Sequence, residues 1–168
     1  MSILIESDRL VIRNFKLTDA PAYHQMTRDK DIQVYVPYAC EETYEETYST
    51  IRDYYSVNDY EYDYYLVIEE KQSGKLVGAI IATALTTSPL NLDVCILTDK
   101  SMRRKGFMYE ALCAFKDAVP KGTTLLFAIA QGNVASYRTV SKLVGIKNTP
   151  FPGELGEMMH HLSLTTWG

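Results

Sequence analysis

The alternation of apolar and polar residues predicts a strand-rich centre to the chain. Three apolar segments rich in β-forming residues read as consecutive strands: residues 63–70, 76–85 and 90–97. Short turns at residues 72–75 and 86–89 separate them, and Gly74 supplies the positive φ that a tight turn often needs. The pattern therefore predicts an antiparallel meander of three strands.

Helical spacing is found on both sides of this meander. Before it we expect a strand at 9–15, a helix at 18–30 capped by Thr18, and a second helix at 42–55. After it we expect a helix at 107–119, a buried strand at 125–130, a helix at 134–144 stopped by Gly145, and a final strand at 159–167. This order predicts an α+β fold: one mixed, mostly antiparallel sheet flanked by helices.

Bulk composition narrows the class of protein. The 168 residues are 46% hydrophobic and 23% charged, which fits a single globular domain over residues 1–168. A net charge of −4 argues against a general nucleic-acid binder, and no apolar run approaches the ~20 residues of a membrane helix. Three cysteines without a CxxC pattern favour free thiols in the cytoplasm and no metal site.

A basic loop stands between the third meander strand and the next helix. Arg103, Arg104 and Lys105 precede Gly106, which lies immediately before that helix. A helix N-terminus has unpaired N–H groups and a partial positive charge, so cations beside it make an anion site. Gly106 lets the backbone approach a ligand where a side chain would collide. The cluster predicts a pyrophosphate site, although an ordinary solvated loop carries the same charges.

The loop and three further segments resemble one family. The loop, from Arg103 to Met108, resembles the Q/R-x-x-G-x-G/A pyrophosphate loop of the GNAT superfamily of N-acetyltransferases. Three other segments resemble its Rim-type branch, which acetylates protein N-termini: Ser7-Asp8-Arg9-Leu10-Val11-Ile12-Arg13, Glu110-Ala111-Leu112, and Asn133-Val134-Ala135-Ser136 followed by Lys142-Leu143. Met108 stands where the family has Gly or Ala, and Val140 stands where many members carry the tyrosine that protonates the leaving thiolate.

The resemblance implies a GNAT fold with a cleft for acetyl-CoA where two strands splay apart. The pantetheine arm is expected along the backbone of Ile96, Leu97 and Thr98, where a backbone N–H also stabilises the oxyanion. The diphosphate is expected at a loop made of Arg103, Arg104, Lys105, Gly106, Phe107 and Met108. Asn133 and Ser136 are expected to hydrogen-bond the cofactor arm, although both also suit the first turn of a helix.

The acceptor in this reading is a primary amine, either a protein N-terminus or a small molecule. Deprotonating a lysine-type amine at pH 7 costs roughly 4–5 kcal/mol, whereas an α-amine costs only about 1. Asp93 lies where Rim-type enzymes often have an acidic residue, so it is a candidate base, with a plain surface carboxylate as the other interpretation. Cys95, on the same side of the strand, suits the core better than a nucleophile.

One further segment leaves two interpretations open. Many of the thirteen tyrosines lie between Tyr35 and Tyr65, interleaved with acidic residues. This stretch is either a solvated face with aromatic packing or an acceptor site for a cationic amine. At the level of the whole protein, an active transferase is one hypothesis, and a degenerate acyl-CoA-binding module or regulatory subunit is the alternative. A homodimer is compatible with either.

Overall fold

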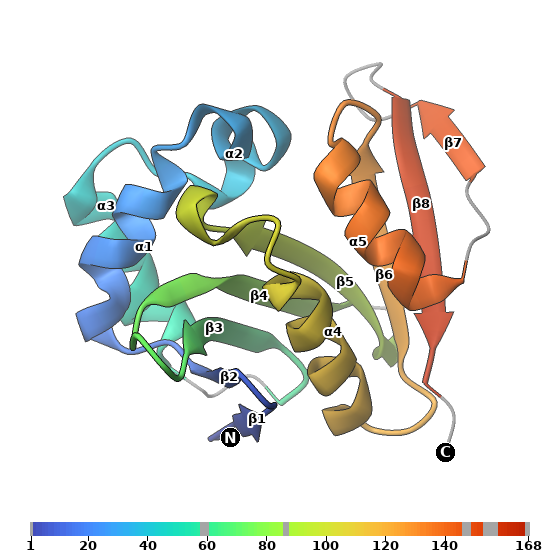
Figure 1. Ribbon diagram of the computed structural model, residues 1–168, viewed down its shortest axis with the longest axis horizontal. Helices are drawn as coiled ribbons and strands as arrows, with labels where there is room; N and C mark the ends of the chain where they lie inside the picture. The colour runs from blue at the N-terminus through green and yellow to red at the C-terminus, as the bar shows by residue number, and fades with distance from the viewer. Residues whose placement is uncertain (1, 58–60, 86–87, 146–148, 153–157, 167–168) are drawn as a thin grey trace.

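The computed structural model describes residues 2–57, 61–85, 88–145, 149–152 and 158–166, without the side chains of Pro89, 149–152 and 158–160. Its strands form one sheet in the order β1-β2-β3-β4-β5-β6-β8-β7 (Figure 1). They are β1 Leu4–Glu6, β2 Leu10–Asn14, β3 Tyr64–Glu70, β4 Leu76–Leu85, β5 Ser88–Thr98, β6 Thr124–Ala130, β7 Thr149–Pro152 and β8 Met158–Thr165. Neighbours are antiparallel except β5 and β6, which run parallel. The mixed, mostly antiparallel α+β fold is confirmed.

Helices cover both faces of this sheet (Figure 1). The described helices are α1 Ala20–Thr27, α2 Lys30–Tyr35, α3 Tyr44–Thr50, α4 Phe107–Ala118 and α5 Val134–Val144. Short turns η1 Leu17–Asp19, η2 Pro37–Ala39 and η4 Lys100–Met102 are 3-10 helices, and η3 Ile51–Tyr55 continues α3 as a π-helix. One core lies under α4 and α5, and a second lies under α1, α2 and η3.

The first predicted helix is wrong in its start and length. The chain forms η1 before α1, and α1 ends at Thr27 and not near residue 30. Thr18 lies inside η1 and does not cap α1, whose N-cap position is Asp19. The Asp19 carboxylate accepts two hydrogen bonds from Arg13 and one from the backbone N–H of Lys16. These bonds fix the turn into η1, so the helix begins later than the apolar spacing predicts.

Strand predictions succeed in the centre of the sheet and fail at its edges. The β4 segment has the predicted bounds, whereas β1, β7 and α2 have no counterpart in the prediction. Pro89 lies in β5 and not in a turn. Residues 86–87 of that predicted turn, and Trp167 of the final strand, lie outside the described residues.

The parallel pair β5 and β6 is short. Only residues 91–93 of β5 pair with residues 124–126 of β6. Beyond Asp93, β5 continues with β4 as its partner, while β6 continues with β8. The sheet therefore opens into a V whose apex is the pair Asp93 and Leu126, and whose arms carry Ile96 on one side and Ile129 on the other.

Candidate functional site

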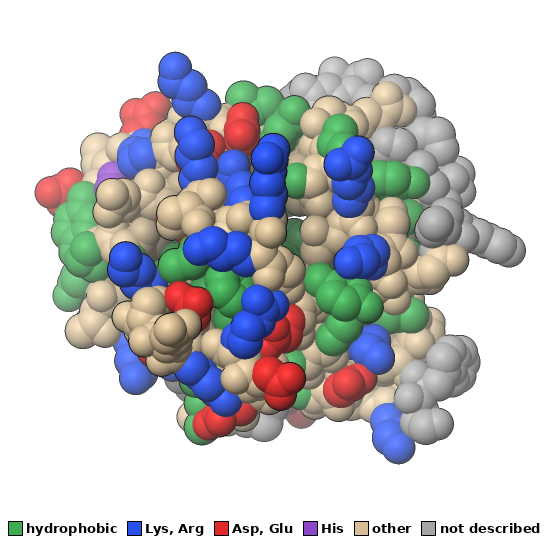
Figure 2. Space-filling view, viewed as in Figure 1, with side chains coloured by type: hydrophobic (Ala, Val, Ile, Leu, Met, Phe, Trp, Pro, Cys, Tyr) green, Lys and Arg blue, Asp and Glu red, His purple; other side chains and the backbone are tan. Residues whose placement is uncertain are grey.

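A cavity of about 440 Å³ lies at the open end of the V. Its walls come from α2, the end of β5, the start of α4, and the turn between β6 and α5. Every residue predicted to bind the cofactor lines it except Lys105: Ile96, Leu97, Thr98, Arg103, Arg104, Gly106, Phe107, Met108, Asn133 and Ser136. Figure 2 shows the hollow with Lys and Arg side chains around it. The structure thus brings together segments that are far apart in the sequence.

The loop before α4 has a backbone shaped for close approach. Gly106 is the N-cap residue of α4 and has φ 76°, and Arg104 has φ 64°, the one positive φ outside glycine among the described residues. Left-handed angles next to a helix N-terminus turn successive N–H groups toward one side, which makes an anion-binding concavity. A Cβ at Gly106 meets only Arg9 at 3.5 Å, so the φ angle and not space demands glycine here.

The three basic side chains of this loop have different surroundings. Arg103 pairs with Asp29 at 3.2 Å and Asp31 at 3.4 Å, and its Nε donates to the carbonyl oxygen of Thr98. Lys105 lies outside the cavity lining, with Nζ 4.0 Å from the sulfur of Met102. Arg104 is exposed and lines the cavity. Of the three, Arg104 therefore has the cationic group best placed to face an anion in the cleft.

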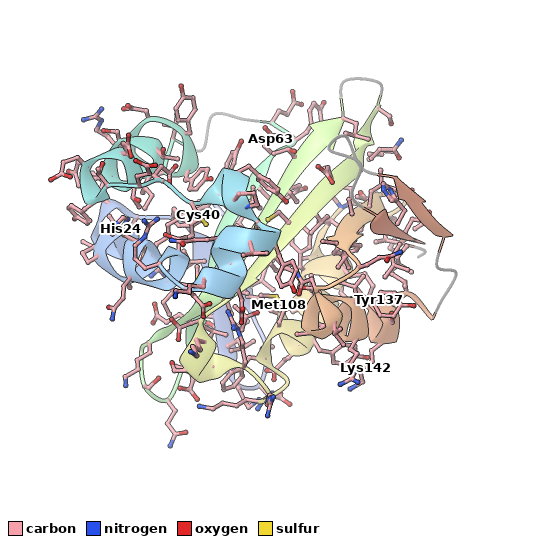
Figure 3. The ribbon with its side chains drawn as sticks, turned by 90° about the horizontal axis from the view of Figure 1, so that it is seen from above. His24, Cys40, Asp63, Met108, Tyr137 and Lys142 are labelled. Atoms are coloured by element: carbon pink, nitrogen blue, oxygen red, sulfur yellow. The ribbon has the colours of Figure 1, made fainter. Side chains whose placement is uncertain are left out.

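Two cations of α5 face the same cavity and were missed in the sequence. Arg138 and Lys142 both line it, from successive turns of the helix. The Lys142 ammonium lies 4.9 Å from the ring centre of Tyr109 on α4, a cation–π contact that joins the two helices across the front of the cleft. Figure 3 shows Lys142 pointing away from the sheet. Their i, i+4 spacing is the signal that places both side chains on one side of α5.

Arg9 supports the loop from the start of β2. Its guanidinium donates to Glu110 at 2.7 Å and to the carbonyl oxygen of Lys105 at 2.9 Å, and it lies 4.4 Å from the ring centre of Phe107. Ser7 and the Arg9 backbone also donate to Glu110. Although burial opposes the shift, these hydrogen bonds hold the pKa of Glu110 below its usual value. The opening motif around Arg9 and the segment from Lys105 to Glu110 are therefore in direct contact.

Met108 fits the start of α4 without distorting it. The helix is regular from Phe107 onward, and Met108 is buried in the core beneath α4 and α5 while also lining the cavity. Figure 3 shows it between the two walls of the cleft. A flexible thioether fills irregular space. The position that holds Gly or Ala in the family thus holds part of the cavity floor here.

The backbone of β5 is open along the cleft. The Leu97 carbonyl points toward β4, where it would lie 2.0 Å from a Cβ on Gly78. Because backbone groups alternate along a strand, those of Ile96 and Thr98 point toward the cleft instead. The Thr98 carbonyl already accepts from Arg103, which leaves the N–H and C=O of Ile96 and the N–H of Thr98 facing the cleft without a paired strand.

The turn between β6 and α5 forms the opposite wall. Asn133 is the N-cap of α5, and its side-chain oxygen accepts from the Ser136 backbone N–H at 3.4 Å. Asn133 and Ser136 also line the cavity, so the capping and cleft-facing roles coexist. Just before them, the Gly132 carbonyl accepts from the Tyr35 hydroxyl at 2.9 Å.

Asp93 lies at the apex of the V, on the face away from α4 and α5. Register places it on the same face as Ala128, His161 and Ser163, all of which are exposed. Asp93 remains exposed, yet partial desolvation at the apex raises the pKa of its carboxyl above the ordinary value, and the neighbouring His161 partly opposes this. Nothing in the sequence links His161 to Asp93, because their proximity depends on how β5 and β8 pair with the two edges of β6.

Cys95 is two residues from Asp93 on the same face of β5. Burial raises the pKa of its thiol to about 12, although a hydrogen bond with Tyr38 opposes the shift. The thiol is therefore protonated at neutral pH, and a protonated thiol is a poor nucleophile. This supports the core interpretation of Cys95.

The acidic, tyrosine-rich stretch is partly a packed aromatic cluster. Tyr55 stacks on Tyr65 with ring centres 4.9 Å apart, and its ring also packs against Phe15 and Tyr23. The Glu46 carboxylate accepts from the backbone N–H of Thr43, the N-cap residue of α3, at 3.0 Å. Several members of the stretch thus stabilise the fold, as the first of the two interpretations expects.

Comparison with known proteins agrees with this architecture. Residues 9–144 match the model of the acetyltransferase (GNAT) domain family. A ribosomal-protein-S5-alanine acetyltransferase from Vibrio fischeri has a TM-score of 0.80 at 18% identity, covering 98% of this chain and 97% of that one. A spermidine N-acetyltransferase SpeG chimera from Vibrio cholerae and hSSAT has a TM-score of 0.78 at 13% identity, covering 95% and 96%.

A third solved structure has a ligand in its description. The RimL ribosomal L7/L12 alpha-N-protein acetyltransferase, in complex with coenzyme A, has a TM-score of 0.78 at 15% identity and covers 97% of this chain and 98% of that one. No curated protein matches the sequence. At these identities the solved structures establish a shared fold.

Taken with the cleft, the family match defines the class of protein: an acyltransferase fold built around a splayed β-strand pair. The chain belongs to the GNAT acetyltransferase domain family, and acetyl-CoA is the acyl donor of that family. Within the described ranges, no helix is both long and apolar enough to cross a bilayer.

Proposed function

We propose that this protein is an N-acetyltransferase that moves the acetyl group of acetyl-CoA to a primary amine by direct attack in a ternary complex. The observation that carries the proposal is the cavity itself. The loop before α4, the open edge of β5 and the N-terminal turn of α5 converge on it, and Asp93 lies at the apex between the same two strands.

The donor fits three features of the cleft. The left-handed angles of Arg104 and Gly106 make a concavity for a diphosphate, with the Arg104 guanidinium beside it. The backbone groups of Ile96 face the cleft and suit the amide-bearing arm or the developing oxyanion. Asn133 and Ser136 face the arm from the opposite wall. The bound donor supplies a thioester whose C–S bond breaks as the amine nitrogen bonds to its carbonyl carbon.

Asp93 is our candidate for the base that takes the proton from the attacking amine. Its raised pKa makes the ionised carboxylate a stronger base than an ordinary aspartate. His161 lies near it and provides a second titratable group on the same open face. The sulfur leaves as the coenzyme A thiolate, while the proton of the amine passes to Asp93.

The acceptor belongs to one of two classes of primary amine, a protein N-terminus or a small molecule. The Rim-like motifs favour an N-terminus, and the structural neighbours include proteins described as acting on ribosomal proteins and on spermidine. An α-amine needs a weaker base than a lysine-like amine does, because the pKa of the α-amine is nearer to neutral. The cytoplasm, where thiols stay reduced, suits a chain whose three cysteines are all unbridged.

A thiol-release assay tests the proposal. Acetyl-CoA is mixed with the protein and a panel of N-terminal peptides, polyamines and lysine-like amines, and free thiol is measured against time. We expect release that depends on at least one amine. Binding of coenzyme A, seen by calorimetry, without amine-dependent release from any member of the panel supports the degenerate module instead.

Replacing the proposed base gives a more specific prediction. Asp93→Asn is expected to lower kcat/KM about 100-fold for a lysine-like amine and much less for an α-amine. In the wild type, kcat/KM should rise as pH passes upward through the Asp93 pKa, because only the ionised carboxylate accepts a proton. Asp117→Asn, on the exposed surface of α4, is the matched control. Equal losses for both kinds of amine, or none, remove Asp93 from the mechanism.

The same variant should not be less stable. The folded-state pKa of Asp93 is above its unfolded value, so the carboxylate favours folding when protonated and loses that contribution as pH rises through the folded pKa. At pH 7 the asparagine variant should therefore melt at the same temperature as the wild type or higher. Melting curves measured at pH 4 and pH 7 check this, because the advantage should shrink at the lower pH.

A further inference from the structure

Helix α2 crosses the open end of the V and contacts both of its walls (Figures 1 and 3). At its N-terminal end, Asp29 caps the helix by accepting from the Asp31 N–H at 2.8 Å. The carboxylates of Asp29 and Asp31 both pair with Arg103 of the loop before α4. This end of α2 is therefore held to the β5–α4 wall, and the Asp29 side chain is only 11% exposed.

The C-terminal end of α2 reaches the other wall. Tyr35 is the last residue of α2, and its hydroxyl donates to the Gly132 carbonyl at 2.9 Å. A Cβ on Gly132 would lie 2.9 Å from the Tyr35 hydroxyl oxygen and 3.1 Å from a ring carbon. A side chain at position 132 would therefore push the tyrosine ring away from the turn, whereas the backbone angle of Gly132 makes no demand for glycine.

The position of this contact gives it a mechanical role. The paired strands part after Asp93, so no β5–β6 ladder sets the width of the cleft at the level of Gly132. The next residue, Asn133, caps α5 and lines the cavity. A hydrogen bond that fixes Gly132 also fixes the orientation of Asn133 relative to β5, even before a ligand binds.

We propose that Tyr35 is a positioning residue for the acyl donor: by bridging α2 to Gly132 it sets the width of the cleft and holds the Asn133 turn in register with β5. The inference rests on the proposed function insofar as the donor occupies this cleft. Preorganisation of this kind raises affinity because the ordering is done before binding. Loss of the bridge should therefore weaken donor binding without touching the phosphate loop.

The first test removes only the hydroxyl. Tyr35→Phe keeps the ring against Gly132 and deletes the hydrogen bond, and coenzyme A binding is measured by calorimetry on the full chain. We expect the Kd to rise roughly fivefold, the change that corresponds to the ~1 kcal/mol of a typical hydrogen bond. The melting temperature should stay within about 2 °C. Tyr54→Phe, a tyrosine 56% exposed and outside the cavity lining, should bind like the wild type.

The second test uses the close approach at Gly132. Gly132→Ala alone forces the tyrosine away from the turn, so it should weaken coenzyme A binding at least as much as Tyr35→Phe. In a Tyr35→Ala background the new methyl group has nothing to displace, so Gly132→Ala should cause little further loss. Additive losses in this double-mutant cycle overturn the proposal, because a bridge predicts strong coupling between the two positions.

A third measurement needs no ligand. Hydrogen exchange of the ligand-free protein should show faster exchange of the Asn133 amide in Tyr35→Phe than in the wild type, because the turn opens more often. Unchanged exchange overturns the bridge. If the wild type fails to bind coenzyme A, the proposed function is overturned. If the wild type and Tyr35→Phe bind coenzyme A equally well, only the role of Tyr35 is overturned.

Discussion

Arg104 has a backbone angle that arginine rarely adopts. A left-handed φ costs a non-glycine residue on the order of 1–3 kcal/mol, and glycine at this position would avoid that cost. The position therefore keeps a strained arginine that lines the cavity. The charge is the physical reason for the strain: an exposed cation beside a helix N-terminus adds directly to an anion site.

Two substitutions separate the strain from the charge. Arg104→Gly removes both, while Arg104→Ala removes the charge and keeps the strain. Both should weaken coenzyme A binding about tenfold, the effect of losing one charge-assisted hydrogen bond. The glycine variant should be the more stable of the two in urea melts, since strain relief exceeds the added unfolded-state entropy of glycine.

Lys105→Ala is the matched control for this pair. Its side chain lies outside the cavity lining, so coenzyme A affinity measured by calorimetry should stay within about twofold. If all three variants lose the same affinity, the loop attracts coenzyme A through its summed positive charge, and Arg104 makes no specific contact. Salt dependence of the wild-type Kd gives a second check on that reading.

At the scale of elements, the pairing of β4 with β5 controls the cleft. Gly78 on β4 lies opposite Thr98, and the Leu97 carbonyl passes so close that a Cβ on Gly78 would lie 2.0 Å from its oxygen. No side-chain rotation relieves a clash with backbone. The close spacing between β4 and β5 at this point is thus possible only because residue 78 has no side chain.

Gly78→Ala should therefore damage stability and binding together. We expect a loss of about 2 kcal/mol in unfolding free energy, within the range of overpacked interiors, and weaker coenzyme A binding in the fraction that folds. Denaturant melts and calorimetry measure the two effects. Gly74→Ala is the comparison: its φ of 66° strains alanine, yet nothing lies within 4 Å of the new Cβ, and binding should be retained.

The elements that the sequence located best are those whose ends are marked by capping and terminating residues. Helix α5 has the predicted bounds because Asn133 caps it and Gly145, with φ 64°, stops it. Helix α2 was missed because six residues give too short a window for helical periodicity, and it is held in place by Arg103 and Gly132 from distant parts of the chain. Tertiary contacts, which no local pattern contains, decide such short helices.

At the scale of the whole molecule, the two cores share the same sheet. The core under α4 and α5 runs from Leu10 of β2 to Leu162 of β8 and so crosses the point where the strands part. The second core joins α1, α2 and η3 to β3, β4 and β5. The V is therefore an opening within one packed unit, and we propose that residues 1–168 are one domain.

A single cooperative unit predicts a single unfolding transition. Far-ultraviolet circular dichroism, which follows the backbone, and near-ultraviolet circular dichroism, which follows the packing of aromatic rings, should give superimposable urea curves. Two separate transitions would show that the β6–β8 side unfolds independently. Saturating coenzyme A should shift the one transition as a whole, since ligand binding stabilises only the folded state.

The residues that line the cavity from the loop before α4 and from the start of α5 were accessible from sequence, whereas the geometry of the cavity was not. The loop from Arg103 to Met108 and the Asn133–Ser136 segment carry recognisable motifs, and both line the cavity. The surroundings of the loop cations depend on Asp29 and Asp31, which pair with Arg103 and not with Arg104 or Lys105 in the described contacts. The neighbourhood of Asp93 and His161 depends on the register between β6 and β8. Motifs identify such residues, but only the fold assigns their partners.

Among the described residues, the face of β6 and β8 that carries Ala128, His161 and Ser163 is bare of helices α1 to α3, while the opposite face packs against α5. Under the proposed function, coenzyme A is gripped from the helix-covered side and the amine arrives from the bare one. Substitutions on this exposed face could therefore change which amine is accepted, while the residues proposed to bind acetyl-CoA stay the same.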